Sequence, residues 1–250
     1  MSGVMSDAAI YAICRELEGV CAELSVPVRL RTILDHTAPR CSTVLANGAH
    51  EITLNLAKIP VTDFRSYAGY HVRSVLLPRM CVQTQRLVLR RYCPEDAEQC
   101  FGFLSDEQDA YMDCCKAFAD MDEEFYQRVA LFGQRETQYM VTLKETGDVI
   151  GTVNLFSDES RAVDAMEIGY SIAKKHQRKG YGFEALSAVL DLLQKQLGLE
   201  MVTAGILPEK SVSQQLLTKL GFQREGLRHK AVWHEGLDRP VDLIYFYRDR

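Results

Sequence analysis

Residues 166–186, "MEIGYSIAKKHQRKGYGFEAL", decide the fold that we predict for this chain. The apolar run 166–173 is typical of a strand, and the run 183–197 repeats apolar residues at helical spacing. The turn between them combines Gly180 and Gly182 with four cations, Lys174, Lys175, Arg178 and Lys179. A helix that begins at such a turn offers unpaired backbone N–H groups and a positive dipole end. The segment therefore predicts a phosphate cradle, and the plain alternative is a solvated basic turn.

Composition narrows the class of protein. The chain has 250 residues, 47% of them hydrophobic and 25% charged, with a net charge of −5, so nothing draws it as a whole to nucleic acid or to an anionic membrane. No apolar run approaches the roughly 20 residues of a membrane helix, and the N-terminus lacks a basic leader region. The eight cysteines form no CxxC pair, so we expect reduced thiols, no metal and a cytoplasmic location.

A change of pattern near residues 78–84 divides the chain into two predicted domains, 1–80 and 82–250. The first reads as a helix with about three strands, including a hairpin over 43–56 that turns at Asn47-Gly48 and a strand over 70–77. It carries no catalytic or binding motif. Three roles for it therefore remain open: a lid, a dimer surface or an element that recognises the acceptor.

The second domain alternates strands and helices in an order that favours an α+β fold. Pro94, followed by two acids, marks a helix start. The predicted fold is a mixed, mostly antiparallel sheet flanked by helices, with a small α/β extension at the N-terminus. We expect strands at 85–92, 137–143, 149–156, 165–173, 200–207, 222–234 and 241–249, and helices after Pro94 and over 120–134, 179–197 and 211–220.

Three phosphate-binding motifs can be compared with the turn. A P-loop requires a lysine and a hydroxyl residue after its last glycine, and neither follows Gly182. The dinucleotide fingerprint GxGxx(G/A) is met by Gly180, Gly182 and Ala185, but it normally opens a parallel sheet, and antiparallel units precede it here. Its acidic ribose partner would have to be Glu209, which lies farther along than usual. A nicotinamide dinucleotide enzyme stays as an alternative.

The third motif, Q/R-x-x-G-x-G/A, is met at every defined position by residues 177–182, "QRKGYG". With this loop the chain resembles the GCN5-related N-acetyltransferases (GNAT superfamily), in particular the RimJ/RimL-like branch that acetylates ribosomal-protein N-termini. The resemblance extends in the right order over about residues 82–248, through "QTQRLVLRRYCPEDAEQCF", "GDVIGTVNLF" and "RPVDLIYFYR".

This resemblance implies that acetyl-CoA binds as co-substrate in a gap between two neighbouring strands. The backbone of Tyr170, Ser171, Ile172 and Ala173 would pair with the pantetheine amides. The pyrophosphate would lie on the loop of Gln177, Arg178, Lys179, Gly180, Tyr181 and Gly182. The family pattern N-x-x-S becomes "KSVS" here, with Lys210 in place of the asparagine and Ser213 in place of the serine.

The resemblance also implies direct transfer of an acetyl group from the thioester to an amine. The chemistry needs a neutral amine, a polarised carbonyl and a proton for the leaving thiolate. We expect Glu167 to act as the base and Ser213 to donate the proton. His176 would assist anion binding, and Lys210 would contact a CoA phosphate or lie in solvent. His229, His234 and Glu235 lie on the last hairpin, which commonly forms the acceptor wall.

The acceptor is left open between a protein N-terminus and a small amine, and a homodimer is one arrangement open to the chain. No nucleic-acid or membrane partner is expected. A third class of function, a sensor module that binds CoA without catalysis, also stays open because Lys210 departs from the pattern.

Overall fold

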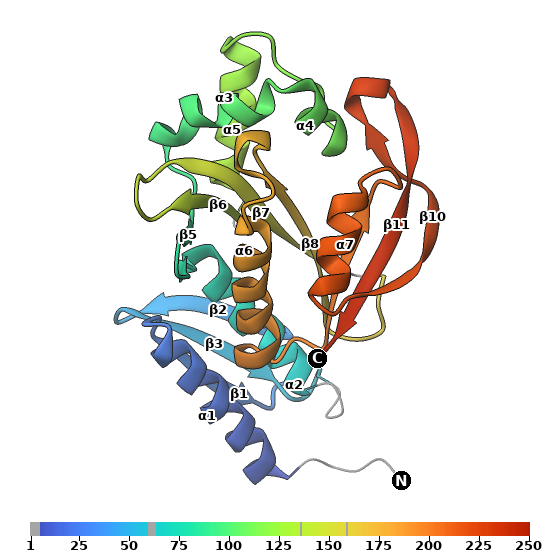
Figure 1. Cartoon of the computed structure of the whole chain (residues 1–250). Coiled ribbons are helices and arrows are strands. Elements are labelled where there is room, and N and C mark those ends of the chain that lie inside the picture. Colours follow the sequence, from blue (N-terminus) through green and yellow to red (C-terminus); the bar gives the residue numbers. More distant parts are fainter. Residues whose placement is uncertain (1–5, 60–63, 136, 159) are drawn as a thin grey trace. The chain divides into compact units, whose positions relative to one another are not determined.

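The computed structural model describes residues 6–59, 64–135, 137–158 and 160–250 (Figure 1). The chain groups into two compact units, one made of residues 1–79 with 193–199 and the other of residues 80–192 with 200–250. Among the helices within the described ranges, none combines the length and the apolar composition that a membrane span requires. Each unit is described separately below.

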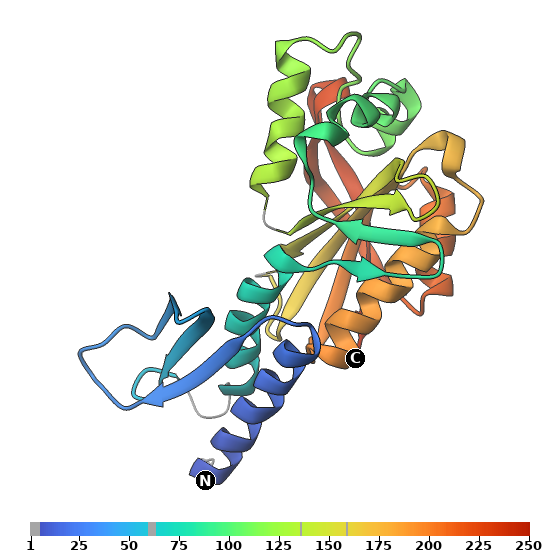
Figure 2. The same ribbon diagram turned by 90° about the vertical axis from the view of Figure 1, so that its left-hand side faces the viewer.

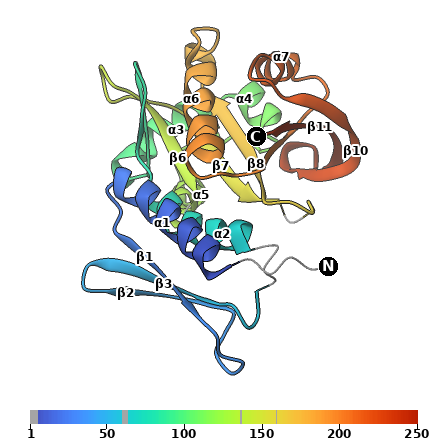
Figure 3. The same cartoon turned by 90° about the horizontal axis from the view of Figure 1, so that it is seen from below.

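The N-terminal unit is a three-stranded sheet with two helices. Its strand order is β1-β3-β2, with β1 and β3 parallel and β2 and β3 antiparallel. The two helices lie side by side over one face of this sheet (Figure 3). The elements are α1 (Asp7–Glu23), β1 (Val28–Ile33), β2 (Cys41–Ala46), β3 (Ala49–Asn55) and α2 (Phe64–Leu76), followed by a 3-10 turn, Leu77–Arg79.

The hairpin predicted for residues 43–56 is confirmed. Strands β2 and β3 pair antiparallel from Cys41↔Leu54 to Ala46↔Ala49. Asn47 and Gly48 both have positive φ, 51° and 75°, which is the backbone of a type I′ turn and the reason that Asn-Gly is favoured there.

The strand predicted for residues 70–77 is wrong, because these residues end α2. Phe64, Ala68, Val72 and Leu76 are all buried, and they recur at every fourth residue. Val75 and Leu76, which are neighbours in the sequence, are also both buried; a strand would turn them to opposite faces, whereas a helix can bury both. Burial against α1 and β3 therefore overrides the strand preference of the valines.

The second unit is built on an eight-stranded sheet of order β10-β11-β9-β8-β7-β6-β5-β4. All neighbouring pairs are antiparallel except β8 with β9. The predicted α+β class with a mixed, mostly antiparallel sheet is therefore confirmed. The strands are β4 (Val82–Gln83), β5 (Leu87–Arg90), β6 (Gln138–Leu143), β7 (Val149–Ser157), β8 (Ala165–Ile172), β9 (Met201–Ile206), β10 (Gln223–His234) and β11 (Arg239–Asp249).

Helices cover both faces of this sheet, with α5 on one side and α6 on the other (Figure 2). On the α5 side, Phe103, Phe125, Val129, Phe132 and Met140 form a buried cluster that joins α3 and α5 to β6. The helices are α3 (Ala97–Leu104), which follows a 3-10 turn at Pro94–Asp96, α4 (Glu107–Met112), α5 (Glu123–Gln134), α6 (Tyr181–Leu190), continued by a π-helical segment Asp191–Gln196, and α7 (Ser211–Lys219).

Strands β8 and β9 separate after a short pairing. They pair parallel only from Ala165↔Met201 to Glu167↔Thr203, whereas β8 continues to Ile172 and β9 to Ile206. The backbone of the second half of β8 is thus paired on one side only, with β7. The gap that opens beyond Glu167 is the feature around which the candidate site is built.

Candidate active site

The turn between β8 and α6 is a cradle of backbone N–H groups. Arg178 and Gly180 both have left-handed backbone conformations, with φ of 61° and 84°, and α6 begins at Tyr181. Within the described chain, the backbone amides of residues 178–182 donate no hydrogen bond to another residue. A row of free donors at a helix N-terminus suits an anion, and the phosphate cradle stays a prediction.

A three-residue clamp, Thr84, Arg86 and Glu184, holds this turn from the other side. Glu184 accepts hydrogen bonds from the Thr84 hydroxyl at 2.5 Å and from the Arg86 backbone amide and Nε, each at 2.7 Å. Arg86 Nη1 donates to the carbonyl of Lys179 at 3.0 Å, and the guanidinium lies over the Tyr181 ring. Burial opposes ionisation of Glu184, yet the bonds from Thr84 and Arg86 keep its pKa below the usual value.

The sequence interpretation missed this clamp. Thr84 and Arg86 belong to the quoted "QTQRL" stretch, but Glu184 lies about a hundred positions later, and no local signal connects them.

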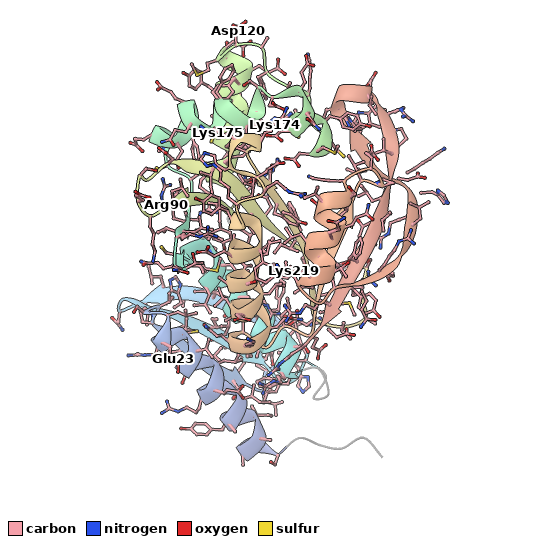
Figure 4. The ribbon with its side chains drawn as sticks, viewed as in Figure 1. Glu23, Arg90, Asp120, Lys174, Lys175 and Lys219 are labelled. Carbon is pink, nitrogen blue, oxygen red and sulfur yellow. The ribbon has the colours of Figure 1, made fainter. Side chains whose placement is uncertain are left out.

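The cations of the turn differ in their partners. Lys174 Nζ lies 3.5 Å from Asp106 Oδ2, whereas Lys175, Arg178 and Lys179 form no ion pair with any residue that the structure describes. Figure 4 labels Lys174 and Lys175 near the N-terminal end of α6. Three uncommitted cations at the cradle raise the local potential for an anion.

A cavity of about 450 Å³, here called the loop cavity, runs along the cradle. A Cβ at Gly180 would lie 3.3 Å from Arg86 Nη2, so a side chain there would press on the clamp. Of the predicted cofactor-binding residues, the cavity is lined by Tyr170, Ser171, Ile172, Gln177, Arg178, Gly180, Tyr181, Gly182, Lys210 and Ser213. Ala173 and Lys179 are not among its lining residues: Ala173 is buried, with its amide bonded to Ile150, and Lys179 uses its carbonyl to hold Arg86.

The unpaired edge of β8 faces this cavity. Because the Ala173 amide bonds to β7, the alternation of a strand turns the backbone groups of Tyr170 and Ile172 toward the gap. The carbonyl of Ile172 accepts a hydrogen bond from Gln177 Nε2 at 2.8 Å. The backbone of Tyr170 is the part of this edge that a ligand amide can reach most directly.

Asp109 is a site residue that the sequence interpretation missed. It is buried in the wall of the loop cavity, where it accepts hydrogen bonds from the Lys174 amide at 2.9 Å and from Gln177 Nε2 at 3.1 Å. Burial raises the pKa of this carboxyl above its usual value. Asp109 thereby ties α4 to the start of the cradle.

A second cavity of about 370 Å³, here called the sheet cavity, is lined by residues of strands β6 to β11 and of helices α3 to α5. It shares five lining residues with the loop cavity, namely Met112, Asp113, Tyr170, Ser171 and Lys210. The residues of β8 alternate between the two, since Ile172 packs toward α6 while Glu167 and Gly169 line only the sheet cavity. The two cavities therefore meet at the gap beside β8.

Glu167 lies where the gap begins. It is the last β8 residue paired with β9, it lines the sheet cavity, and its Oε2 accepts a hydrogen bond from the Tyr245 hydroxyl at 3.3 Å. Burial, and then the nearby charge of Asp158, raise the pKa of Glu167. A half-buried carboxylate with a raised pKa has the properties of a proton acceptor.

Ser213 lies on the other side of the gap. It is 6% exposed, in the first turn of α7, and it lines the loop cavity. The Tyr170 hydroxyl donates a hydrogen bond of 3.4 Å to the Ser213 carbonyl, and burial raises the pKa of Tyr170 to about 12. The sequence interpretation gave Tyr170 only a backbone role, whereas its side chain lies at the junction of both cavities.

The ammonium group of Lys210 is bonded to other residues of the chain. Its Nζ donates to the carbonyl of Met112 at 3.1 Å and pairs with Asp113 Oδ1 at 2.8 Å. It is thus not free in solvent, and it joins the end of α4 to the β9–α7 loop.

The three histidines singled out by the sequence lie in different surroundings. His176 lines the loop cavity, and burial followed by Lys175 and Lys179 lowers its pKa. His229 is exposed and pairs with Asp242 at 2.9 Å, and His234 is buried against the Tyr111 ring. Neither of these two lines the sheet cavity, although Val232 and Leu243 of the same hairpin do, and an acceptor wall at the histidines stays a prediction.

Two further predictions concern metals and thiols. The eight cysteines are all free thiols. Within the described residues, no three His, Cys, Asp or Glu side chains gather in a group that could hold a metal ion.

Comparison with known proteins agrees with this geometry. The model of the acetyltransferase (GNAT) domain family matches residues 86–223, which is more than half of the chain. An uncharacterised N-acetyltransferase of Bacillus subtilis, YoaA, is 30% identical over 68% of this chain and 97% of its own length. The [ribosomal protein uS5]-alanine N-acetyltransferase of Escherichia coli is 27% identical over 60% of this chain and 81% of its own. A crystal structure of a GNAT-family acetyltransferase from Bacillus anthracis superposes with a TM-score of 0.59 at 23% identity, covering 68% of this chain and 98% of that one.

The fold is that of the GNAT acetyltransferases. The chain belongs to the GNAT acetyltransferase family, and it is a GNAT-type N-acetyltransferase. Enzymes of this family use acetyl-CoA as co-substrate. The dinucleotide alternative loses its basis, because the glycines follow the one parallel strand pair of an otherwise antiparallel sheet.

The residues present fit this co-substrate. Free amides at 178–182 suit a pyrophosphate, and a side chain at Gly182 would bring its Cβ to 3.3 Å from Leu216 Cδ2, so the glycine keeps the cavity open.

Proposed function

We propose that this protein transfers the acetyl group of acetyl-CoA to a primary amine bound in the sheet cavity. The observation that carries the proposal is the meeting of the two cavities at the gap beside β8. A thioester held along the loop cavity would reach the gap from one face of β8, and an amine would reach it from the other.

Glu167 and Ser213 would then carry out the two proton transfers of the reaction, one at the amine and one at the sulfur. Glu167, on the sheet-cavity side, would take the proton that the ammonium must lose before it can attack. Ser213, on the loop-cavity side, would supply a proton to the sulfur that leaves. Tyr170 keeps its proton because its pKa is about 12. Its hydroxyl would support the same sulfur as a hydrogen-bond donor once it leaves the Ser213 carbonyl, to which it donates in this structure.

The acceptor that we favour is the α-amino group of a protein N-terminus. The support is the E. coli relative, whose name specifies an alanine of a ribosomal protein. Among the described residues that line the sheet cavity, the acids are Asp113 and Glu167, and Asp113 is already paired with Lys210, so no acidic pair is left there to hold a second ammonium of a polyamine.

The test begins with calorimetric titration of the full chain with acetyl-CoA, with NADH as the control ligand. We expect micromolar binding of acetyl-CoA alone. Release of CoA thiol is then followed with an alanine-initial peptide, free alanine and spermidine, in wild type and in Glu167→Gln and Ser213→Ala. Binding without turnover on any amine would favour the CoA sensor, and binding of NADH would overturn the proposal.

A further inference from the structure

The three-stranded sheet of the N-terminal unit has two edge strands, β1 and β2, and they differ in how they are protected. Helix α1 packs against β1, and Glu18 of that helix accepts a hydrogen bond from the Leu30 backbone amide at 2.7 Å. Arg29 and Arg31 add two charges to the same strand. Covering elements and charged side chains prevent an edge strand from pairing with another chain. The β1 edge is therefore blocked.

The β2 edge lacks this protection. The strand reads "CSTVLA", with neither a charged residue nor a proline, and its described ladder with β3 has no bulge. Residues 42–45 are all exposed, and β3 is the one described element that packs along the strand. Val44 is 55% and Leu45 69% exposed, although both side chains are large and apolar. Such an edge is open to a further strand.

Every second residue of β2 turns its backbone groups away from β3. The Asn55 amide bonds to the Arg40 carbonyl at 3.0 Å just before the strand begins, and inward-facing residues alternate with outward-facing ones along an antiparallel pair. The even-numbered residues thus bond to β3, and the backbone N–H and C=O groups of Thr43 and Leu45 face outward. No described backbone group outside β2 bonds to them. They form a row of donors and acceptors suited to an antiparallel strand.

The edges of the eight-stranded sheet give a comparison within the same protein. One edge strand, β4, has only two residues. The other, β10, is interrupted by irregularities between Arg224 and Gly226 and between Arg228 and Val232. Short edge strands and bulges are both known means of preventing edge pairing. Among the edge strands of the described chain, β2 is therefore the unprotected one.

We propose that the β2 edge pairs antiparallel with β2 of a second copy of this chain, which joins two three-stranded sheets into one of six strands. The absence of charge on β2 favours this partner. A two-fold axis sets the strand against an identical strand, so a charged residue would lie close to its own copy, and β2 has no such residue. The blocked β1 edges would end the joined sheet on both sides and limit the assembly to two copies.

The dimer should be a weak one. Two strands of six residues cover less surface than the roughly 1,600 Å² of a standard interface. We therefore expect a dissociation constant of about 10–100 μM. The inference concerns the N-terminal unit and does not rest on the function proposed above, so neither acetyl-CoA nor an amine is needed to test it.

The experiment compares the full wild-type chain with Thr43→Lys and Thr32→Lys. Both variants replace an exposed threonine on an edge strand of the same sheet by lysine, the first on β2 and the second on β1. Sedimentation velocity gives the oligomeric state from about 1 to about 300 μM, a range that brackets the expected dissociation constant. Amide hydrogen exchange of wild type is measured at both ends of that range, and thermal unfolding shows whether each variant is folded.

Wild type should be monomeric at the low concentration and dimeric at the high one, where exchange over residues 40–46 should slow by about threefold or more. Thr43→Lys should stay monomeric, because its two lysines would lie close together across the axis, and Thr32→Lys should dimerise like wild type. A wild type that stays monomeric overturns the inference. A dimer without slower exchange over residues 40–46, or one that Thr43→Lys leaves intact, also overturns it. If Thr43→Lys does not fold, the exchange of wild type decides.

Discussion

The two cavities of the site are built in different ways. Most of the loop cavity comes from one continuous stretch, residues 170–183, and its main ligand-facing groups are backbone amides. The sheet cavity takes its lining from strands β6 to β11 and helices α3 to α5, and its polar groups are side chains. Acetyl-CoA binding in the loop cavity should therefore be sensitive to changes in backbone conformation. Amine binding and catalysis in the sheet cavity should be sensitive to the identity of single side chains.

The largest effect that we expect is on the sheet-cavity side. Glu167→Gln removes the proposed base, so kcat should fall by about 10²- to 10⁴-fold. The acetyl-CoA Kd should not change, because Glu167 does not line the loop cavity. Steady-state kinetics and calorimetry measure the two quantities. Glu145→Gln, in an exposed turn, is the control. A variant that keeps more than a tenth of the wild-type kcat would remove Glu167 from catalysis.

The next effect tests the backbone character of the loop cavity. Gly180→Ala and Gly147→Ala both put a side chain on a left-handed backbone, with φ of 84° and 78°. Each should destabilise the fold by about 1–2 kcal/mol. Only Gly180→Ala should also weaken acetyl-CoA binding, by about tenfold or more, because Gly147 has open space around it and lies outside the cavity. Thermal unfolding measures the loss of stability, and calorimetry measures acetyl-CoA affinity. Equal acetyl-CoA affinity in the two variants would contradict the role that we give to the backbone of the loop cavity.

A smaller effect is expected from the clamp behind the cradle. Glu184→Gln weakens the hold on Thr84 and Arg86, and acetyl-CoA affinity should fall by about three- to tenfold at neutral pH. The pKa of Glu184 is lowered, so its stabilising contribution is present above the unfolded-state pKa and is lost as the pH falls through the folded-state value. The difference in unfolding temperature between wild type and variant should therefore shrink in acid. An affinity change for the amine as well would show that the cavities are more strongly coupled than we infer.

The smallest effect is on stability. Burial and Asp158 raise the pKa of Glu167, so the folded state favours its protonated form. The contribution of such a group is present below the unfolded-state pKa and is lost as the pH rises through the folded-state pKa. Glu167→Gln should therefore unfold at an equal or slightly higher temperature than wild type at pH 7, by about 1–3 °C. The difference in unfolding temperature should disappear near pH 3, below the unfolded-state pKa of about 4.3, where Glu167 is protonated in both states. A variant that is less stable at pH 7 would mean that the bond from Tyr245 outweighs desolvation.

The sequence alone determined the parts of this protein that depend on a few neighbouring residues. Asn47-Gly48 specified a hairpin turn, Pro94 a helix start, and 166–186 a strand, a cradle and a helix, because allowed backbone conformations and unpaired amides are local properties. The same local order placed Glu167 on a strand and Ser213 in the first turn of a helix.

Only the tertiary structure decided the rest, because the remaining features depend on contacts between distant residues. It made residues 64–76 a helix, where burial overrode the strand preference of the valines. It also placed residues 193–199 in the N-terminal unit and brought Thr84 to Glu184. Asn154 lies opposite Gly169 only because β7 and β8 pair in one register, and side-chain surroundings of that kind are set by the packed fold.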